Sequence, residues 1–373
     1  MQSVTMHAMA NTNQRKRGKV QNRDDDRADA VTHGNAPVPE PRTDCFTVAS
    51  IYDAAPMIRL RTAPVVAALA LLAFVLVASG CGGGSNSRIT DHIKTGALPR
   101  GLAIGEGAVW VVNSSADSLA KIDPKSKKVV ASNIATGEGP AFATVGEGGV
   151  WVATQTIDTV VLINPKTNRV EGRPTRVGYP AGITTGAGSV WVANQTPIVE
   201  SIPASIARIN PQTHKIEKMV PIAGNPGDVA FGEGGVWASD TERGTLVHID
   251  PSTNKIVGQP VRVGDGAEGV AVGFGAVWVV TQGDGTLVKA DPRTGQVITT
   301  TKLGVQPRYV AVGEGAVWAV STIDDKVWEI DPKTAKVRGK PITVEGQPFD
   351  VVAGEGAVWV SSQEQEAVFR IKP

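Results

Sequence analysis

Short apolar stretches alternate with polar turn residues along most of the chain, and one of these stretches recurs seven times. The recurring phrase reads VAVGEGAVWAV at 310–320, and related versions begin at residues 102, 143, 183, 229, 270 and 351. After each Gly-x-Gly triplet, Val and Trp alternate with small residues, which is the period of two expected for a strand with one buried face. Because Gly tolerates positive φ, the triplet predicts the turn of a β-hairpin in every copy.

The Trp residues of the seven copies define the length of the repeat. Successive Trp residues lie 41, 40, 46, 41, 40 and 41 positions apart, and in most copies an Asp-Pro or Asn-Pro pair follows 13 positions later. A period of this length decides the architecture of a chain. We expect the Trp side chains to pack between repeats and the Pro pairs to form turns. The seven residues are Trp110, Trp151, Trp191, Trp237, Trp278, Trp318 and Trp359.

Each repeat predicts four short strands. In the sixth repeat the strands are expected at 309–312, 316–321, 326–330 and 336–344. No segment of the repeats has a convincing helical period. Four strands per unit of about 40–45 residues are typical of the blades of a β-propeller, so the fold class is all-β.

The two ends of the repeat region predict how the ring closes. The seventh repeat ends at 372–373, where its fourth strand is due, and residues 88–95 align 41 positions ahead of a fourth strand at 128–136. We therefore predict a seven-bladed propeller with four-stranded blades over 88–373, closed one-plus-three by the N-terminal strand 88–95. Such closure also removes a free sheet edge.

The segment before the repeats has a different composition. Residues 1–56 are polar and poor in large apolar side chains, so we expect disorder; alternatively, Met57 is the true initiator and 1–56 are upstream sequence translated in error. Residues 57–80 begin with basic residues, continue as an apolar run and end in small residues, as a signal peptide does. The ending Ala-Ser-Gly-Cys resembles a bacterial lipobox, which implies a lipid on Cys81 and a Gly/Ser linker over 81–87.

These features predict an extracytoplasmic protein that is anchored to a bacterial cell membrane as a lipoprotein; an uncleaved signal anchor is the alternative. Removal of 1–80 would leave Cys81 as the only thiol of the two Cys in the chain, which excludes a disulfide scaffold. A formal net charge of +1 argues against a general nucleic-acid binder. We expect a monomer.

The repeat pattern GxGAVWVAN…IDPxTxKV…P, which covers 89–373, resembles bacterial YVTN-type propellers and the virginiamycin B (streptogramin) lyase superfamily. The resemblance implies the propeller fold and, for a lyase, a catalytic His with a Glu and a divalent metal at the channel mouth. His92, His214 and His248 are expected on the closing strand, on a bottom turn and in a third strand, away from that mouth. We therefore expect no catalytic residue, no metal and no cofactor.

Function is sought where the copies differ, which is the inner rim of the top face. Here "top" is the face that carries the loops from strand four to the next strand one and from strand two to strand three, and "bottom" is the opposite face. The third copy also has six extra residues within 195–204 that should project from the top; a neutral insertion is the alternative. The rim forms a candidate site for a polar ligand; a rim that is merely solvated is the alternative. The candidate residues are Arg100, Phe142, Asp228, Glu268, Arg308, Tyr309, Phe349 and Asp350.

The outer bottom turns are rich in Lys and Arg, and the outer top loops are acidic. Residues 82–87 span at most about 20 Å, so a lipid on Cys81 would hold the bottom toward an anionic membrane. The preferred function is non-catalytic binding of an envelope protein, a cell-wall polymer or a small polar ligand through the top face. The alternatives are a metal-dependent lyase or hydrolase that uses the channel mouth, and a purely structural envelope scaffold.

Overall fold

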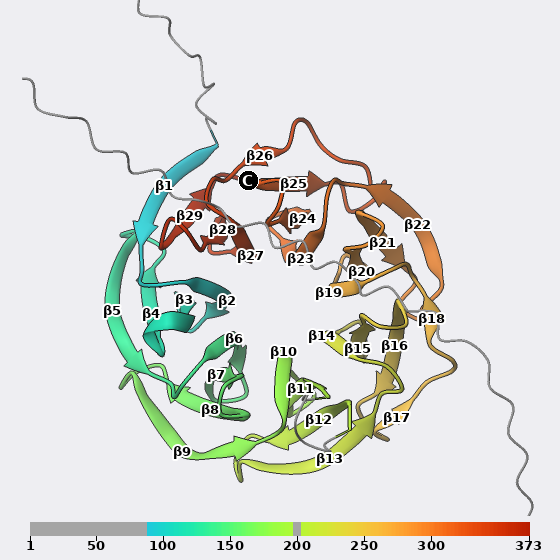
Figure 1. Cartoon of the computed structure of the whole chain (residues 1–373), viewed down its shortest axis with the longest axis horizontal. Coiled ribbons are helices and arrows are strands. Elements are labelled where there is room, and N and C mark those ends of the chain that lie inside the picture. Colours follow the sequence, from blue (N-terminus) through green and yellow to red (C-terminus); the bar gives the residue numbers. More distant parts are fainter. Residues whose placement is uncertain (1–87, 197–202) are drawn as a thin grey trace, which may run out of the picture. The chain divides into compact units, whose positions relative to one another are not determined.

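The computed structural model describes residues 88–196 and 203–373, in which seven antiparallel sheets surround a central axis (Figure 1). The predicted all-β, seven-bladed propeller with four-stranded blades is confirmed. The described residues contain no helix long and apolar enough to cross a membrane. The innermost strands of successive blades are β2 (Pro99–Gly105), β6 (Pro140–Gly146), β10 (Tyr179–Gly186), β14 (Pro226–Gly232), β19 (Ala267–Gly273), β23 (Pro307–Gly313) and β27 (Pro348–Gly354).

Two further strands follow in each blade before the outer edge is reached. The second strands are β3 (Ala108–Asn113), β7 (Gly149–Thr154), β11 (Ser189–Gln195), β15 (Gly235–Asp240), β20 (Ala276–Thr281), β24 (Ala316–Ser321) and β28 (Ala357–Ser362). The third strands are β4 (Ser118–Asp123), β8 (Thr159–Asn164), β12 (Ser205–Asn210), β16 (Thr245–Asp250), β21 (Thr286–Ala290), β25 (Lys326–Ile330) and β29 (Ala367–Ile371). The short 3₁₀ turn η1 (Ser114–Ala116) follows β3.

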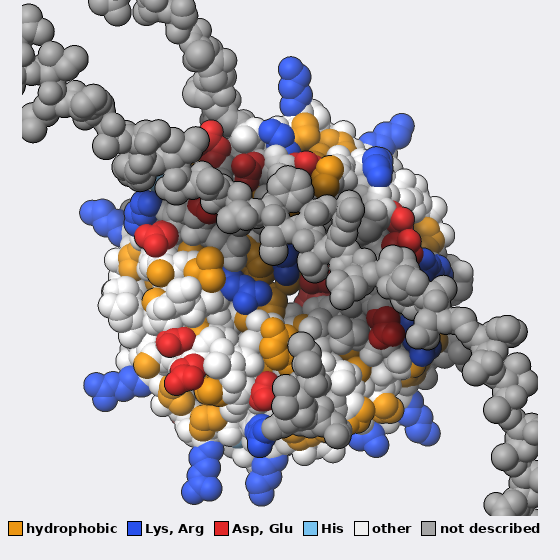
Figure 2. Space-filling view, viewed as in Figure 1, with side chains coloured by type: hydrophobic (Ala, Val, Ile, Leu, Met, Phe, Trp, Pro, Cys, Tyr) orange, Lys and Arg blue, Asp and Glu red, His pale blue; other side chains and the backbone are white. Residues whose placement is uncertain are grey.

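The outer strands are less regular. They are β5 (Lys128–Ala135), β9 (Arg169–Arg176), β13 (Lys215–Pro221), β17 (Lys255–Ile256) with β18 (Val261–Arg262), β22 (Val297–Lys302), β26 (Ile342–Thr343) and β1 (Ile89–Lys94). The last of these pairs antiparallel with β29, so the predicted closure by the N-terminal strand is confirmed. Figure 2 shows Lys and Arg side chains projecting outward around the circumference of the ring.

The continuous fourth strand predicted at 336–344 was wrong. Only Ile342–Thr343 pairs as a strand, together with a single bridge between Ile330 and Val337. Gly339 has φ 65°, which turns the chain out of the extended conformation, and Pro341 has no N–H to donate to the ladder. The outer edge of the fourth blade, β17 and β18, is interrupted at a similar Gly-x-Pro sequence.

The repeated Trp residues occupy the centres of the second strands, which are buried along almost their whole length because neighbouring blades cover both faces. All seven indoles are fully buried. In six of them Nε1 donates to the carbonyl of the Gly five residues earlier, as Trp110 does to Gly105 at 3.2 Å. The packing role predicted for these residues is confirmed.

In three blades a cation on the third strand joins the Trp to the next blade. Lys121 Nζ lies 4.8 Å from the Trp110 ring and donates to the Pro165 carbonyl of the second blade at 2.8 Å. Arg208 and Lys289 make the same pair of contacts in the third and fifth blades. The recurring Pro turns therefore hold adjacent blades together as well as reversing the chain.

The Gly-x-Gly hairpins make a second inter-blade contact on the bottom face. In the sixth blade Glu314 has φ 51° and Gly315 has φ 76°, the two positive values that a type I′ turn requires. The Glu314 carboxylate accepts the Gly356 N–H of the next blade at 3.0 Å. The second and fourth blades make the same bond to their successors. Phe274 occupies the place of this Glu in the fifth blade.

Candidate functional site at the channel mouth

All eight candidate residues fall on two ring positions, nine and ten residues before the repeated Trp. Every innermost strand has a register irregularity at its top end, between its first residue and the regular ladder. Such irregularities re-aim side chains. The first position holds Gly101, Phe142, Gly182, Asp228, Gly269, Tyr309 and Asp350; the second holds Arg100, Ala141, Ala181, Gly227, Glu268, Arg308 and Phe349.

Three aromatic side chains from the second, sixth and seventh blades meet at the mouth. The ring centroids of Phe142 and Tyr309 are 5.8 Å apart, those of Tyr309 and Phe349 are 5.3 Å apart, and those of Phe142 and Phe349 are 6.4 Å apart. All three side chains are buried. Because they come from separate blades, their contacts narrow the mouth and tie these blades to one another. Figure 2 shows hydrophobic, basic and acidic side chains gathered around a hollow at the centre of the ring.

Two arginines lie against this aromatic group. The guanidinium carbons of Arg100 and Arg308 are each 4.7 Å from the Phe349 ring centroid, within the range of a cation–π contact. Arg100 also donates to Gln155 Oε1 at 3.2 Å. The Nε atoms of both arginines are buried without a hydrogen-bond partner, and neither guanidinium is in an ion pair among the described residues.

The charges at the mouth are not balanced in pairs. Burial lowers the pKa of Arg100, and repulsion from Arg308 acts in the same direction, opposed by Tyr309. Burial raises the pKa of Glu268, while the nearby charge of Arg308 opposes that rise. The mouth therefore combines two partly buried guanidinium groups with the carboxyl group of Glu268, which is less ready to ionise than usual.

Asp228 and Asp350 connect neighbouring blades. Each carboxylate accepts hydrogen bonds from backbone N–H groups of two blades. Asp350 Oδ1 accepts from Val351 N at 2.8 Å, and Oδ2 accepts from Leu102 N of the first blade, also at 2.8 Å. Asp228 repeats this arrangement with Val229 and with Val270 of the fifth blade, at 2.8 and 3.0 Å. We call this arrangement the aspartate clasp.

A serine completes each clasp. The N–H of Asp350 donates to Ser361 Oγ at 3.0 Å, and the Ser361 hydroxyl donates to the Arg100 carbonyl of the next blade at 2.6 Å. Ser239 bridges Asp228 and the Glu268 carbonyl in the same way. The clasps thus hold the backbone of two rim residues, Arg100 and Glu268, in place.

Below the aromatic group the channel contains a cavity of about 270 Å³, lined mainly by apolar residues of the innermost strands. Asp228 and Asp350 are half-buried and line this cavity. Burial raises the pKa of Asp228 to about 8 and that of Asp350 to about 7, against the opposing effect of the backbone N–H donors. The cavity is therefore walled by two carboxyl groups that are readily protonated near neutral pH.

The three described histidines, His92, His214 and His248, lie where the sequence places them, away from the mouth, and take part in packing. His92 of β1 stacks on Phe369, and His248 of β16 stacks on Trp237 with ring centroids 4.0 Å apart. His214, which lies in a bottom turn, makes an edge contact with Trp151. Within 88–196 and 203–373 no group of three His, Cys, Asp or Glu residues could hold a metal ion. Cys81 and residues 197–202 of the insertion lie outside the described residues.

The serines of the two aspartate clasps could have been recognised from the sequence. Sequence reasoning identified the rim residues and placed Ser239 and Ser361 beside them, but assigned these serines no role. A signal was present: Ser stands two positions after the repeated Trp only in the fourth and seventh repeats, the two repeats that also carry Asp nine positions before it.

The sequence matches no protein-family model and no curated protein. Its fold is similar to that of a catalytically inactive variant of virginiamycin B lyase from Staphylococcus aureus solved with quinupristin, with a TM-score of 0.65 and 17% identity over 76% of this chain and 98% of that chain. A streptogramin B lyase gives 0.62 and 15% over 76% and 96%. The WD40 propeller domain of Doa1 gives 0.63 and 13% over 76% and 96%. The expected virginiamycin lyase-like propeller is thus confirmed at the level of fold.

Proposed function

We propose that this protein is a lipid-anchored extracytoplasmic propeller that binds a ligand with an anionic group at the mouth of its top face, without catalysis. The observation that carries the proposal is the pair of partly buried guanidinium groups of Arg100 and Arg308, which lie against Phe349, have unpartnered Nε atoms and form no ion pair among the described residues. An envelope protein, a cell-wall polymer or a small polar ligand that carries a carboxylate or phosphate would fit such a site. The lipid on Cys81 accounts for the location.

An ionised group that is withdrawn from water without a partner destabilises the folded protein. A carboxylate or phosphate oxygen on the ligand would supply that partner through charge-assisted hydrogen bonds, which are stronger than neutral ones. Phe349 supports both guanidinium groups and so fixes their direction at low entropic cost. Repulsion between Arg100 and Arg308 would then be replaced by attraction to the shared anion.

Thermal unfolding of residues 82–373 against phosphate, citrate and cell-wall fragments tests this proposal. A ligand at 100 times its dissociation constant should stabilise the fold by about 2.7 kcal/mol. The variants Arg100→Gln and Arg308→Gln should abolish the shift, whereas Arg293→Gln, which removes an exposed cation of the bottom face, should leave it unchanged. A shift that survives in both rim variants would contradict the proposal. Absence of any shift would direct the search to protein partners.

A lyase or hydrolase is the second candidate function. The position of Glu268 at the channel mouth is the observation that favours it. Its carboxyl group lies at the mouth with a raised pKa, as a general acid or base requires. Incubation with quinupristin, followed by mass spectrometry of the depsipeptide, would detect cleavage that Glu268→Gln should abolish. An unchanged depsipeptide after prolonged incubation with added divalent metals would exclude this substrate.

A further inference from the structure

Phe274 is an anomaly on the bottom face. It occupies the first turn position of the β19–β20 hairpin, where five of the other six repeats have Glu and one has Ala. Its φ is 54°, a conformation that is unfavourable for a bulky side chain. The residue is nonetheless 48% exposed, so about half of it lies open to solvent. The other hairpins have a similar positive φ at this position, so the exposed aromatic ring is what sets this hairpin apart and points to a use outside the fold.

A groove of about 540 Å³ begins at Phe274 and runs between the fifth and sixth blades. Phe274, Gly315 and Pro332 supply apolar surface, and Lys333 adds an exposed cation. Arg338 also lines the groove, where its guanidinium pairs with Asp331 at 2.6 Å and neutralises that carboxylate. In contrast to the hairpins with Glu, this sector therefore presents an aromatic ring beside cations.

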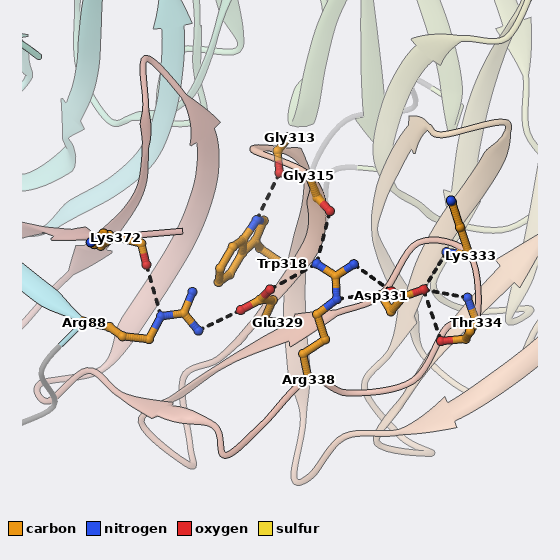
Figure 3. Close-up of polar contacts among 10 residues, drawn as sticks. All are labelled: Arg88, Gly313, Gly315, Trp318, Glu329, Asp331, Lys333, Thr334, Arg338 and Lys372. Atoms are coloured by element: carbon orange, nitrogen blue, oxygen red, sulfur yellow. Dashed lines mark hydrogen bonds and ion pairs between the residues drawn. The ribbon is translucent and has the colours of Figure 1, made fainter.

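The N-terminal strand enters the ring beside this groove. Arg88, the first described residue, donates to Glu329 at 2.7 Å, and Glu329 also accepts from Arg338 at 3.2 Å (Figure 3). Arg88 further lies over the Trp318 ring and donates to the Lys372 carbonyl at 3.1 Å. Glu329 therefore links the entry point of the chain to Arg338 of the groove wall through two ion pairs.

We propose that the bottom face at the fifth and sixth blades docks onto an anionic lipid membrane, with Phe274 inserted at the headgroup level and Lys333 facing the lipid phosphates. The orientation rests on the proposed lipid anchor: residues 82–87 reach at most about 20 Å, so a lipid on Cys81 would hold this side of the ring at the bilayer. An exposed aromatic ring flanked by cations has the chemistry of an interfacial contact. The top mouth then faces away from the membrane.

The test uses the unlipidated unit 82–373, which contains the whole closed ring and its core, with vesicles of phosphatidylglycerol and phosphatidylcholine. We expect binding that increases with the anionic fraction. Phe274→Glu introduces the residue of five other repeats and so should keep the melting temperature, while lowering the partition coefficient about tenfold through loss of apolar burial. Lys333→Glu should lower the partition coefficient about fivefold or more.

Ile323→Glu is the matched control, because Ile323 is 63% exposed on the top face and the substitution is chemically equivalent. Its partition coefficient should equal that of the parent. Phe274→Trp gives a direct readout of insertion: all native Trp residues are buried, so a blue shift on vesicle addition and quenching by brominated lipid would report the new indole alone.

Three results would overturn the proposal: no binding of the parent to any vesicle, equal loss in Ile323→Glu and Phe274→Glu, or an unquenched Trp at 274. Failure of the lipid anchor is a separate outcome. It is read from the mass of the Cys81 peptide in the full-length chain expressed in bacteria, and it would leave the vesicle result of the unlipidated unit standing.

Discussion

Replacement of Asp350 by Ala should destabilise the ring at the junction between the seventh and first blades. The Asp350 carboxylate accepts the N–H groups of Val351 and Leu102 at 2.8 Å each, and Leu102 belongs to the blade on the other side of the closure. Ala leaves both donors without an acceptor. Each unsatisfied buried donor costs about 1–3 kcal/mol, and because the neighbouring cavity can admit water, we expect a total loss of about 2–3 kcal/mol.

Urea unfolding followed by far-ultraviolet circular dichroism would measure this loss, and hydrogen exchange would locate it at the Leu102 amide. Asp350→Asn keeps one acceptor oxygen and should cost about half as much. Asp228→Ala is the matched control, because the same two bonds are lost at the junction of the fourth and fifth blades, away from the closure. A loss below about 0.5 kcal/mol in both Ala variants, or an unchanged Leu102 exchange rate, would refute the clasp as a stabilising element.

Two further predictions concern the same part of the channel. Because the pKa values of Asp228 and Asp350 in the folded state, about 8 and about 7, lie above the ordinary value, the folded state retains protons that the unfolded state releases. The free energy of unfolding should therefore fall as pH rises from about 4 to 8 and level off above that range; urea midpoints at pH 5, 7 and 9 check this, and a rise over the range would contradict it. Gly101→Ala should cost about 1–3 kcal/mol, since a Cβ there would lie 2.6 Å from the Ala141 carbonyl oxygen; a melting temperature equal to that of the parent would contradict this.

The blade count, the closure and the Trp packing could be predicted because they depend on local patterns that repeat. Each hairpin is specified by Gly at positive φ and by alternation around the Trp, so one period suffices to place the second strand of every blade. The outer strands were less predictable, because they face a neighbour on one side only and a single Gly-x-Pro breaks them, as at Gly339 and Pro341.

The contacts at the mouth could not be predicted, because they join residues whose distance depends on the diameter of the ring. Phe142 meets Phe349 over more than 200 positions of sequence, and no local pattern encodes that meeting. The aspartates on the rim were counted with the arginines as ligand-binding groups. Their carboxylates also accept backbone N–H groups, a structural role that only the accompanying Ser239 and Ser361 reveal in the sequence.

The odd number of blades explains where the mouth becomes asymmetric. At the ring position nine residues before the Trp, Gly alternates with a larger residue, because a Cβ on Gly101, Gly182 or Gly269 would collide with the next blade. Seven positions cannot alternate completely, so two large side chains must be neighbours somewhere. They are Tyr309 and Asp350 of the sixth and seventh blades. Arg308 and Phe349 lie beside them and Arg100 follows in the next blade, so the break in alternation coincides with the arginine pair proposed to bind the ligand.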